Sequence, residues 1–181
     1  MTLSELESKI NAAIADLSGS PALISAGFEA GQSIIAQIAD RIRTRGLDSE
    51  NQPFTPYSTN QLPAFFYIGK SRTTSANNAV KQKAKKKETL SYADFRQING
   101  LKTDKKNFEF TGEMFRELKV LSVQLQGTLL VIEYGGGTKA SEDKFRWNSE
   151  QEGESILKPA KSEISIAEQI ILNRVKRLIN G

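Results

Sequence analysis

The segment KVLSVQLQGTLLVIEY, residues 119–134, decides the fold class of this chain. Its two runs of apolar and β-branched residues, Lys119–Leu125 and Thr128–Tyr134, are divided by Gln126-Gly127, a pattern typical of a β-hairpin. Helical patterns lie on both sides of it in the sequence. We therefore expect an α+β fold, in which N-terminal helices and a C-terminal helix pack on a small antiparallel sheet.

Apolar residues at steps of three and four predict the long helices. Two are expected before the hairpin, over residues 3–17 and 21–45, separated by Gly19-Ser20-Pro21 and ended by Gly46. A C-terminal helix is expected to begin at Ser162. We find no internal repeat and no second region with its own core, so the chain is expected to be one domain over residues 1–181.

Two short helices are expected between these long elements. Ser91 can cap the first, with Asp94 three residues later completing a capping box, and the helix would end near Asn99-Gly100. Thr111 can cap the second, over residues 112–118. The stretch from the hairpin to Asn148 is polar and shows no such signal.

Residues 47–90 lack any periodic pattern, and we expect an extended arm followed by a basic loop. The arm, over residues 53–68, is rich in proline and aromatic residues. Uncovered aromatic side chains need a surface to pack on, so the arm is expected to contact a neighbouring subunit. The expected contact residues are Phe54, Tyr57, Phe65, Phe66 and Tyr67.

The positive charge of the chain is concentrated in one segment. The 25 Lys and Arg against 21 Asp and Glu give a net charge of +4, but residues 51–87 alone hold seven cations and no acid. A segment of this kind is a solvated loop, a site for an acidic protein, or a site for DNA phosphates. All three interpretations stay open for the seven cations, Lys70, Arg72, Lys81, Lys83, Lys85, Lys86 and Lys87.

The composition excludes several classes of chemistry. The chain has no His and no Cys, which rules out a Ser-His-Asp triad, a Cys nucleophile, and any zinc site built from thiolates or imidazoles. Glu113 and Glu117, one helical turn apart, are the best candidates for a carboxylate pair, but Arg116 and Lys119 lie nearby to neutralise them. We expect a protein that is not an enzyme and that uses no metal and no cofactor.

The remaining sequence signals are weaker. Gly69-Lys70-Ser71 resembles the end of a phosphate-binding P-loop, but Ala64 stands where that motif needs glycine. Gly135-Gly136-Gly137 is interpreted as a flexible turn. No apolar stretch is long enough to cross a membrane, and the N-terminus lacks the pattern of a signal peptide, so no membrane contact is expected.

Short motifs occur along residues 35–180 in an order that matches a known family. The first group joins a helix end, a Gly-Leu-Asp turn and a Pro-aromatic arm: Arg41-Ile42-Arg43, Gly46-Leu47-Asp48, Gln52-Pro53-Phe54 and Pro56-Tyr57-Ser58. The second runs from Tyr92 to Gly100-Leu101 and then from Phe108 to Met114, with a Thr-Gly-x-Met element. The third precedes the C-terminal helix: Phe145 to Asn148, Glu150, Glu152-Gly153 and Ser155-Ile156-Leu157. In this order and spacing, the chain resembles the tail-completion and neck (head-tail joining) proteins of tailed bacteriophages.

The resemblance implies a structural virion protein that forms a ring, commonly a hexamer, where the phage tail joins the head. The implied partners are other copies of the chain and the neck, connector or tail-tube proteins. The implied location is the neck or tail of the virion, with the host cytoplasm as the place of assembly. The alternative is a sequence-independent nucleic-acid-binding module that uses the Lys-rich loop 81–87, and the genomic DNA in the channel would be its non-specific contact.

Overall fold

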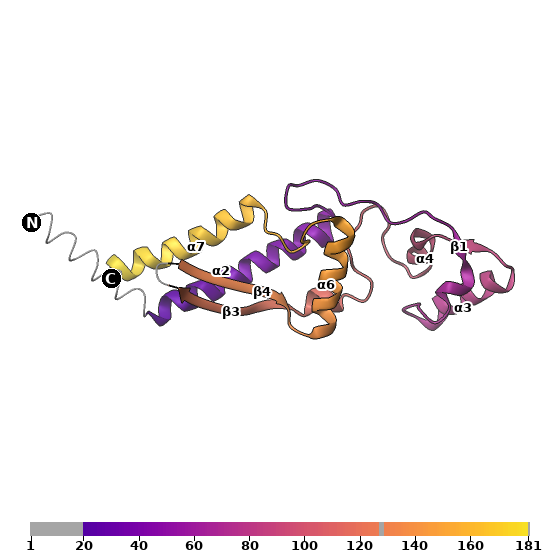
Figure 1. Cartoon of the computed structure of the whole chain (residues 1–181), viewed down its shortest axis with the longest axis horizontal. Coiled ribbons are helices and arrows are strands. Elements are labelled where there is room, and N and C mark those ends of the chain that lie inside the picture. Colours follow the sequence, from indigo (N-terminus) through magenta and orange to yellow (C-terminus); the bar gives the residue numbers. More distant parts are fainter. Residues whose placement is uncertain (1–19, 127–128, 181) are drawn as a thin grey trace, which may run out of the picture.

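The computed structural model describes residues 20–126 and 129–180 and shows an elongated molecule with a larger body and a smaller lobe (Figure 1). Two connecting segments, residues 54–61 and 101–112, run between the body and the lobe. The α+β fold is confirmed. The helix predicted over residues 3–17 lies outside the described residues. The body contains α2 (Pro21–Asp40), α5 (Glu113–Arg116), β3 (Leu118–Gln126), β4 (Leu129–Gly136), α6 (Lys139–Glu152) and α7 (Lys161–Asn180).

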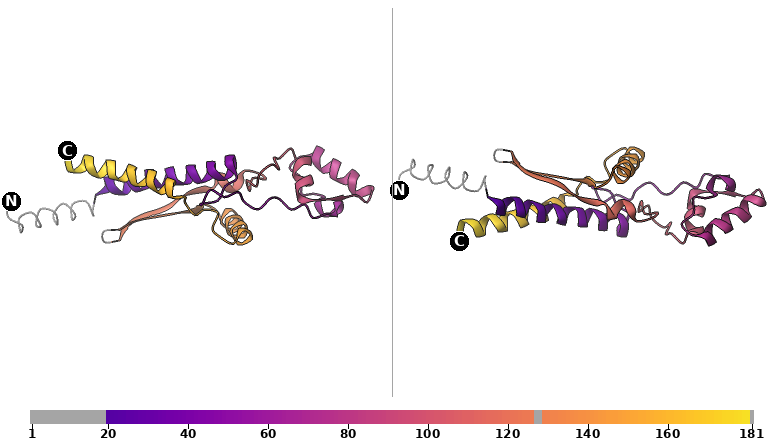
Figure 2. Two further views of the ribbon diagram at one scale, coloured as in Figure 1. Left: turned by 90° about the horizontal axis from the view of Figure 1, so that it is seen from above. Right: turned by 90° about the horizontal axis from the view of Figure 1, so that it is seen from below.

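Helix α2 lies at the centre of the body. The hairpin of β3 and β4 packs on one side of α2, and α7 lies beside it on another (Figure 2). The hairpin comes close because α2 presents glycine there: a Cβ atom at Gly31 would lie 2.7 Å from Val120 Cγ2 and 2.9 Å from Ile132 Cγ2. The core of the body therefore forms around α2, and α7 packs mainly on this helix.

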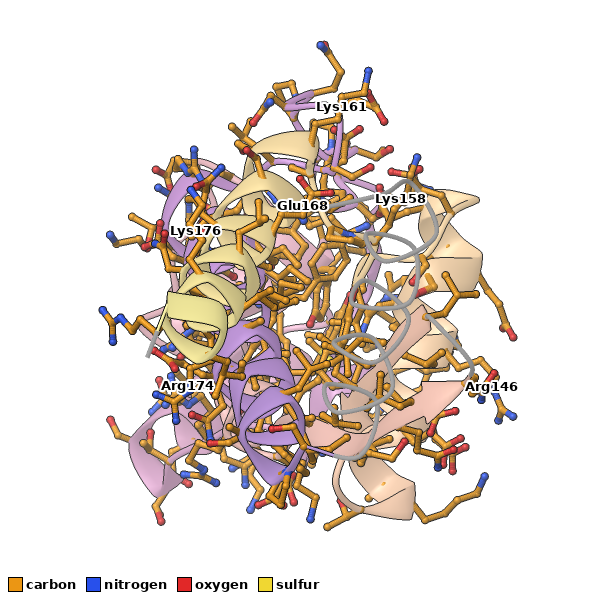
Figure 3. All side chains as sticks on the ribbon, turned by 90° about the vertical axis from the view of Figure 1, so that its left-hand side faces the viewer. Arg146, Lys158, Lys161, Glu168, Arg174 and Lys176 are labelled. Atoms are coloured by element: carbon orange, nitrogen blue, oxygen red, sulfur yellow. The ribbon has the colours of Figure 1, made fainter. Side chains whose placement is uncertain are left out.

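The predicted hairpin is confirmed. Strands β3 and β4 pair antiparallel, with Leu118 opposite Gly136 at one end and Gln126 opposite Leu129 at the other. The pairing register shifts between Val120 and Ser122, which marks a β-bulge. Figure 3, a view along the long axis from the body end, shows the core side chains enclosed by α2, α7 and the hairpin, with Arg174 and Lys176 of α7 pointing outward.

The predicted helix over residues 21–45 is also confirmed, with one addition. After Asp40 the helix widens into a π-helical turn, Arg41–Arg45, and then ends at Gly46. Gly46 has φ of +69°, the left-handed conformation that glycine adopts most easily.

Helix α6 was missed, because the sequence from the hairpin to Asn148 was interpreted as an irregular polar stretch. Thr138 caps α6 through a capping box with Ser141 in place of the usual acid. The helix buries Phe145, whose ring packs edge-on against Phe115 with 5.9 Å between the centroids. Gly136, expected in a flexible turn, ends β4, and a Cβ atom there would lie 2.5 Å from the backbone nitrogen of Glu142. That glycine is needed for the close approach of β4 to α6.

The structure of the lobe differs from the extended arm and basic loop expected for residues 47–90. Its residues 70–87 do not form a basic loop, because most of them belong to a helix. The lobe contains β1 (Leu62–Pro63), a 3₁₀ helix η2 (Ala64–Tyr67), α3 (Thr74–Lys85), β2 (Thr89–Leu90) and α4 (Tyr92–Ile98). The predicted capping box of Ser91 and Asp94 is confirmed at the start of α4.

The lobe also has a hydrophobic cluster of its own, which the sequence did not reveal. It consists of buried residues from η2, α3, β2 and α4: Ala64, Tyr67, Val80, Leu90 and Phe95. The pairing of β1 with β2, two residues each, holds these elements together.

Candidate partner-binding surface

The 3₁₀ helix η2 decides which aromatic residues face outward. Because this helix has three residues per turn, Ala64 and Tyr67 share one face, and both are buried in the lobe. Phe65 and Phe66 then fall on the outer side, where they are 59% and 48% exposed. Their rings stack on each other with 4.4 Å between the centroids.

Phe65 and Phe66 form an exposed apolar surface with two neighbours in the sequence, Leu62 and Ile68, which are also exposed. We call these four residues the tip patch. Single exposed apolar residues are normal on protein surfaces, but four within seven positions concentrate exposed apolar side chains on one short segment, a feature that is typical of interaction sites. Of the five predicted contact residues, only Phe65 and Phe66 are exposed, and Leu62 and Ile68 were not predicted.

The other three predicted contact residues are buried within the chain itself, which corrects that part of the expectation. Phe54 packs edge-on against Phe108 at 4.8 Å, and the Tyr67 ring stacks on Phe95 at 4.6 Å. The Tyr57 hydroxyl donates a hydrogen bond to Asn107 Oδ1 at 3.0 Å and accepts one from its backbone N–H at 3.1 Å. Burial raises the pKa of Tyr57 above its ordinary value.

Helix α3 carries three of the seven predicted cations, Lys81, Lys83 and Lys85, and Lys86 and Lys87 follow directly after it. Thr73 caps the helix by accepting a hydrogen bond from the Ala76 N–H at 3.2 Å. Only two residues of α3, Ala76 and Val80, are buried against the rest of the lobe. Lys81 and Lys85 lie one turn apart, and both are exposed. Lysines in the last turn of a helix are also favoured by the partial negative charge of its C-terminus, so they stabilise α3 whatever else they bind.

The lobe has a strong excess of positive charge. Residues 62–100 contain eight cationic and two acidic side chains, giving a net charge of +6. Lys83 pairs with Glu88 at 2.7 Å and lowers the pKa of that carboxyl. The other six predicted cations have no carboxylate within 4.0 Å in the described part of the chain: Lys70, Arg72, Lys81, Lys85, Lys86 and Lys87.

The carboxylate pair and the Gly69-Lys70-Ser71 segment make other interactions in the structure. Lys144 lies 2.5 Å from Glu113 and lowers the pKa of that carboxyl, the opposite of what a general acid needs. Helix α5 ends at Arg116, before Glu117. The Gly69 N–H is already bonded to Asn77 Oδ1 at 2.8 Å, so it is not available to a phosphate. Residues 20–126 and 129–180 contain no cluster of three or more acidic side chains suited to a metal ion.

Comparison with models of protein families, with curated proteins and with solved structures finds no match for this chain. Within the described ranges, no helix has both the length and the apolar composition needed to span a bilayer. The resemblance to phage neck proteins therefore stays a prediction, and the surface of the lobe is the observation on which a function can be argued.

Proposed function

We propose that this protein is a structural subunit of a ring in the neck or tail-completion region of a tailed bacteriophage, where it joins the tail to the head. The observation that carries the proposal is the tip patch at the lobe of an elongated molecule (Figure 1). About half of each of the Phe65 and Phe66 side chains is exposed, so an assembly that covers them would remove apolar surface from water.

The size of the tip patch fits assembly through several weak contacts. Burying one half-exposed large apolar side chain releases about 1 kcal/mol, so its four residues contribute roughly 4 kcal/mol. Loss of translational and rotational freedom on association costs about 4 kcal/mol or more. One patch alone therefore does not hold two molecules together, whereas contacts repeated around a ring reinforce one another. The proposed partners are other copies of the chain and the neck, connector and tail-tube proteins of the same phage.

The test is assembly with the connector and tail-tube proteins of the same phage, followed by light scattering and electron microscopy. We expect a ring, with six copies as the predicted number, and we expect the double variant Phe65→Ser, Phe66→Ser to remain unassembled. Leu172→Ser is the matched control, because Leu172 is an exposed apolar residue on α7 outside the patch. Equal assembly of the double variant and the native chain would overturn the proposed role of the patch.

A second candidate function, sequence-independent binding of nucleic acid, is favoured by the exposed cations of α3 and the turn after it. Phosphate contacts make affinity depend on salt, with a slope of about 0.9 for each neutralised phosphate. Replacing Lys81, Lys85, Lys86 and Lys87 with serine should reduce that slope by about 3 to 4 on a DNA column. The control replaces four cations of α7 with serine: Lys161, Arg174, Lys176 and Arg177. If the two variants elute from the column alike, the lobe has no specific role in binding DNA.

A further inference from the structure

A pocket of about 520 Å³ lies where the lobe meets the body, between α4 on one side and α5 and α6 on the other. We call it the waist pocket. Volumes of this size accommodate small ligands or one or two side chains of a peptide. Six aromatic rings contribute to its lining: Tyr57, Tyr92, Phe108, Phe110, Phe115 and Trp147.

The wall of the waist pocket is electropositive. Arg96, only 1% exposed, bonds to neutral acceptors: the carbonyl oxygen of Glu109 at 2.9 Å, Asn107 Oδ1 at 3.0 Å and the carbonyl oxygen of Lys102 at 3.2 Å. Its guanidinium carbon lies 4.0 Å from the centre of the Tyr57 ring. No carboxylate neutralises Arg96 among the residues that the structure describes. Its charge therefore acts on whatever enters the pocket.

The other charged groups of the lining do not cancel this charge. Lys144 pairs with Glu113 across the pocket wall, and Lys106 pairs with Glu152. With Lys106 and Lys144 each paired to a carboxylate, Arg96 is the cation of the lining that has no carboxylate partner among the described residues, so the charge of the wall is a net positive one. A ligand with negative charge is favoured there over a neutral or cationic one.

Two residues of the lining have unusual conformations or exposure. Trp147 is 61% exposed, and tryptophan is enriched among the residues that contribute most to the binding energy of interfaces. Phe108 has φ of +52°, which is rare and costly for a bulky residue and is typical of functional sites. Both features indicate a surface prepared for a ligand.

We propose that the waist pocket binds an acidic peptide segment of a partner protein through one bulky apolar anchor residue. The apolar lining takes the anchor, and the net positive charge of the wall, to which Arg96 contributes without a carboxylate partner, attracts the flanking carboxylates. The tip patch of a second copy is a poorer occupant, because its lobe carries a charge of +6 and would bring like charges together. The proposal concerns a different surface from the tip patch and does not depend on the ring.

The chain provides a specific reporter, because Trp147 is its only tryptophan. The full-length protein is titrated with three capped peptides, EDFDE, EDADE and QNFNQ, while tryptophan emission and the single indole N–H signal in an NMR spectrum are followed. We expect saturable changes with EDFDE. Binding of EDADE should be at least about tenfold weaker because the phenyl ring is missing, and QNFNQ should bind more weakly as its charge is absent.

The variant Lys144→Gln tests the role of charge, with Lys139→Gln as its control on the same helix but outside the pocket. Loss of one partly exposed charge should weaken EDFDE binding about two- to fivefold in the first variant and not in the second. Circular dichroism establishes that both variants are folded. The proposal fails if EDFDE produces no saturable change, or if QNFNQ binds equally well. If the spectra change with protein concentration when no peptide is present, the pocket is occupied by a second copy of the chain. That result would also overturn the proposal.

Discussion

Arg41 and Glu163 form a buried ion pair, with 2.7 Å between Nε and Oε1 and side chains that are 1% and 3% exposed. The pair joins the end of α2 to the first turn of α7, although the two residues are 122 positions apart. Arg41 also donates to the carbonyl oxygens of Leu47 and Lys158, each at 2.9 Å, and Glu163 Oε2 accepts from the Ala160 N–H at 2.7 Å. Both charged groups are thus hydrogen-bonded within the core.

The substitution Glu163→Leu should lower the free energy of unfolding by about 3–5 kcal/mol, because it leaves the Arg41 charge buried without its partner. The double variant Arg41→Met, Glu163→Leu should recover much of the loss. Urea denaturation measures both effects. Glu168→Gln, an exposed position on α7 (Figure 3), serves as the control. Equal stability of the single and double variants would contradict a role for the unpaired charge.

Gly31→Val should lower the free energy of unfolding by about 3 kcal/mol, because the new side chain would overlap Val120 and Ile132 of the hairpin. Ala36→Val, an exposed position on the same helix, should change it by less than about 0.5 kcal/mol. Chemical denaturation provides the comparison. Similar values for the two variants would show that the hairpin does not need the close approach at Gly31.

Asp94→Asn should remove part of the dependence of stability on pH. The Ser91 hydroxyl and its backbone N–H, together with Gln61, hold the pKa of Asp94 below its ordinary value. A carboxyl with a lowered pKa in the folded state stabilises the protein above its unfolded pKa of about 3.9, and this stabilisation is lost as the pH falls through the folded value. Denaturation at pH 7 and pH 3 should therefore differ less in Asp94→Asn than in the native chain, and equal differences would contradict this role of the carboxylate.

Phe65→Ser with Phe66→Ser should leave stability nearly unchanged, whereas Tyr67→Ala should lower it by about 3 kcal/mol. The reason is that Tyr67 is buried against Phe95, while its two neighbours face solvent. Thermal unfolding of the two variants tests this difference. A large loss of stability in the phenylalanine variant would show that the tip patch is part of the core of the lobe.

The elements that sequence reasoning identified have strong local signals. Both the hairpin and α2 have long apolar patterns, and Ser91 with Asp94 forms a capping box. Helices α3 and α6 were missed because few of their positions are buried and apolar, chiefly Val80 in one and Phe145 in the other. Their stability depends on contacts with distant residues, which no local pattern shows.

The candidate surface was predicted only in part, for a similar reason. Ala64 and Tyr67 are buried on one face because residues 64–67 form a 3₁₀ helix, in which residues three positions apart share a face. The sequence carries no pattern that predicts this helix, so it could not show that Phe65 and Phe66 face outward while Tyr67 is buried. The burial of Tyr57 depends on Asn107, fifty residues later. The waist pocket brings together residues from both connecting segments and from α6, and no spacing in the sequence indicates it.

The contacts of Arg96 have a consequence for the whole molecule. This side chain on α4 bonds to three residues of the returning segment and lies over Tyr57 of the outgoing one, so it ties both connections at the same level. Arg96 therefore joins the outgoing and the returning segment to each other and to the lobe, so a substitution at this one residue would loosen both connections at once.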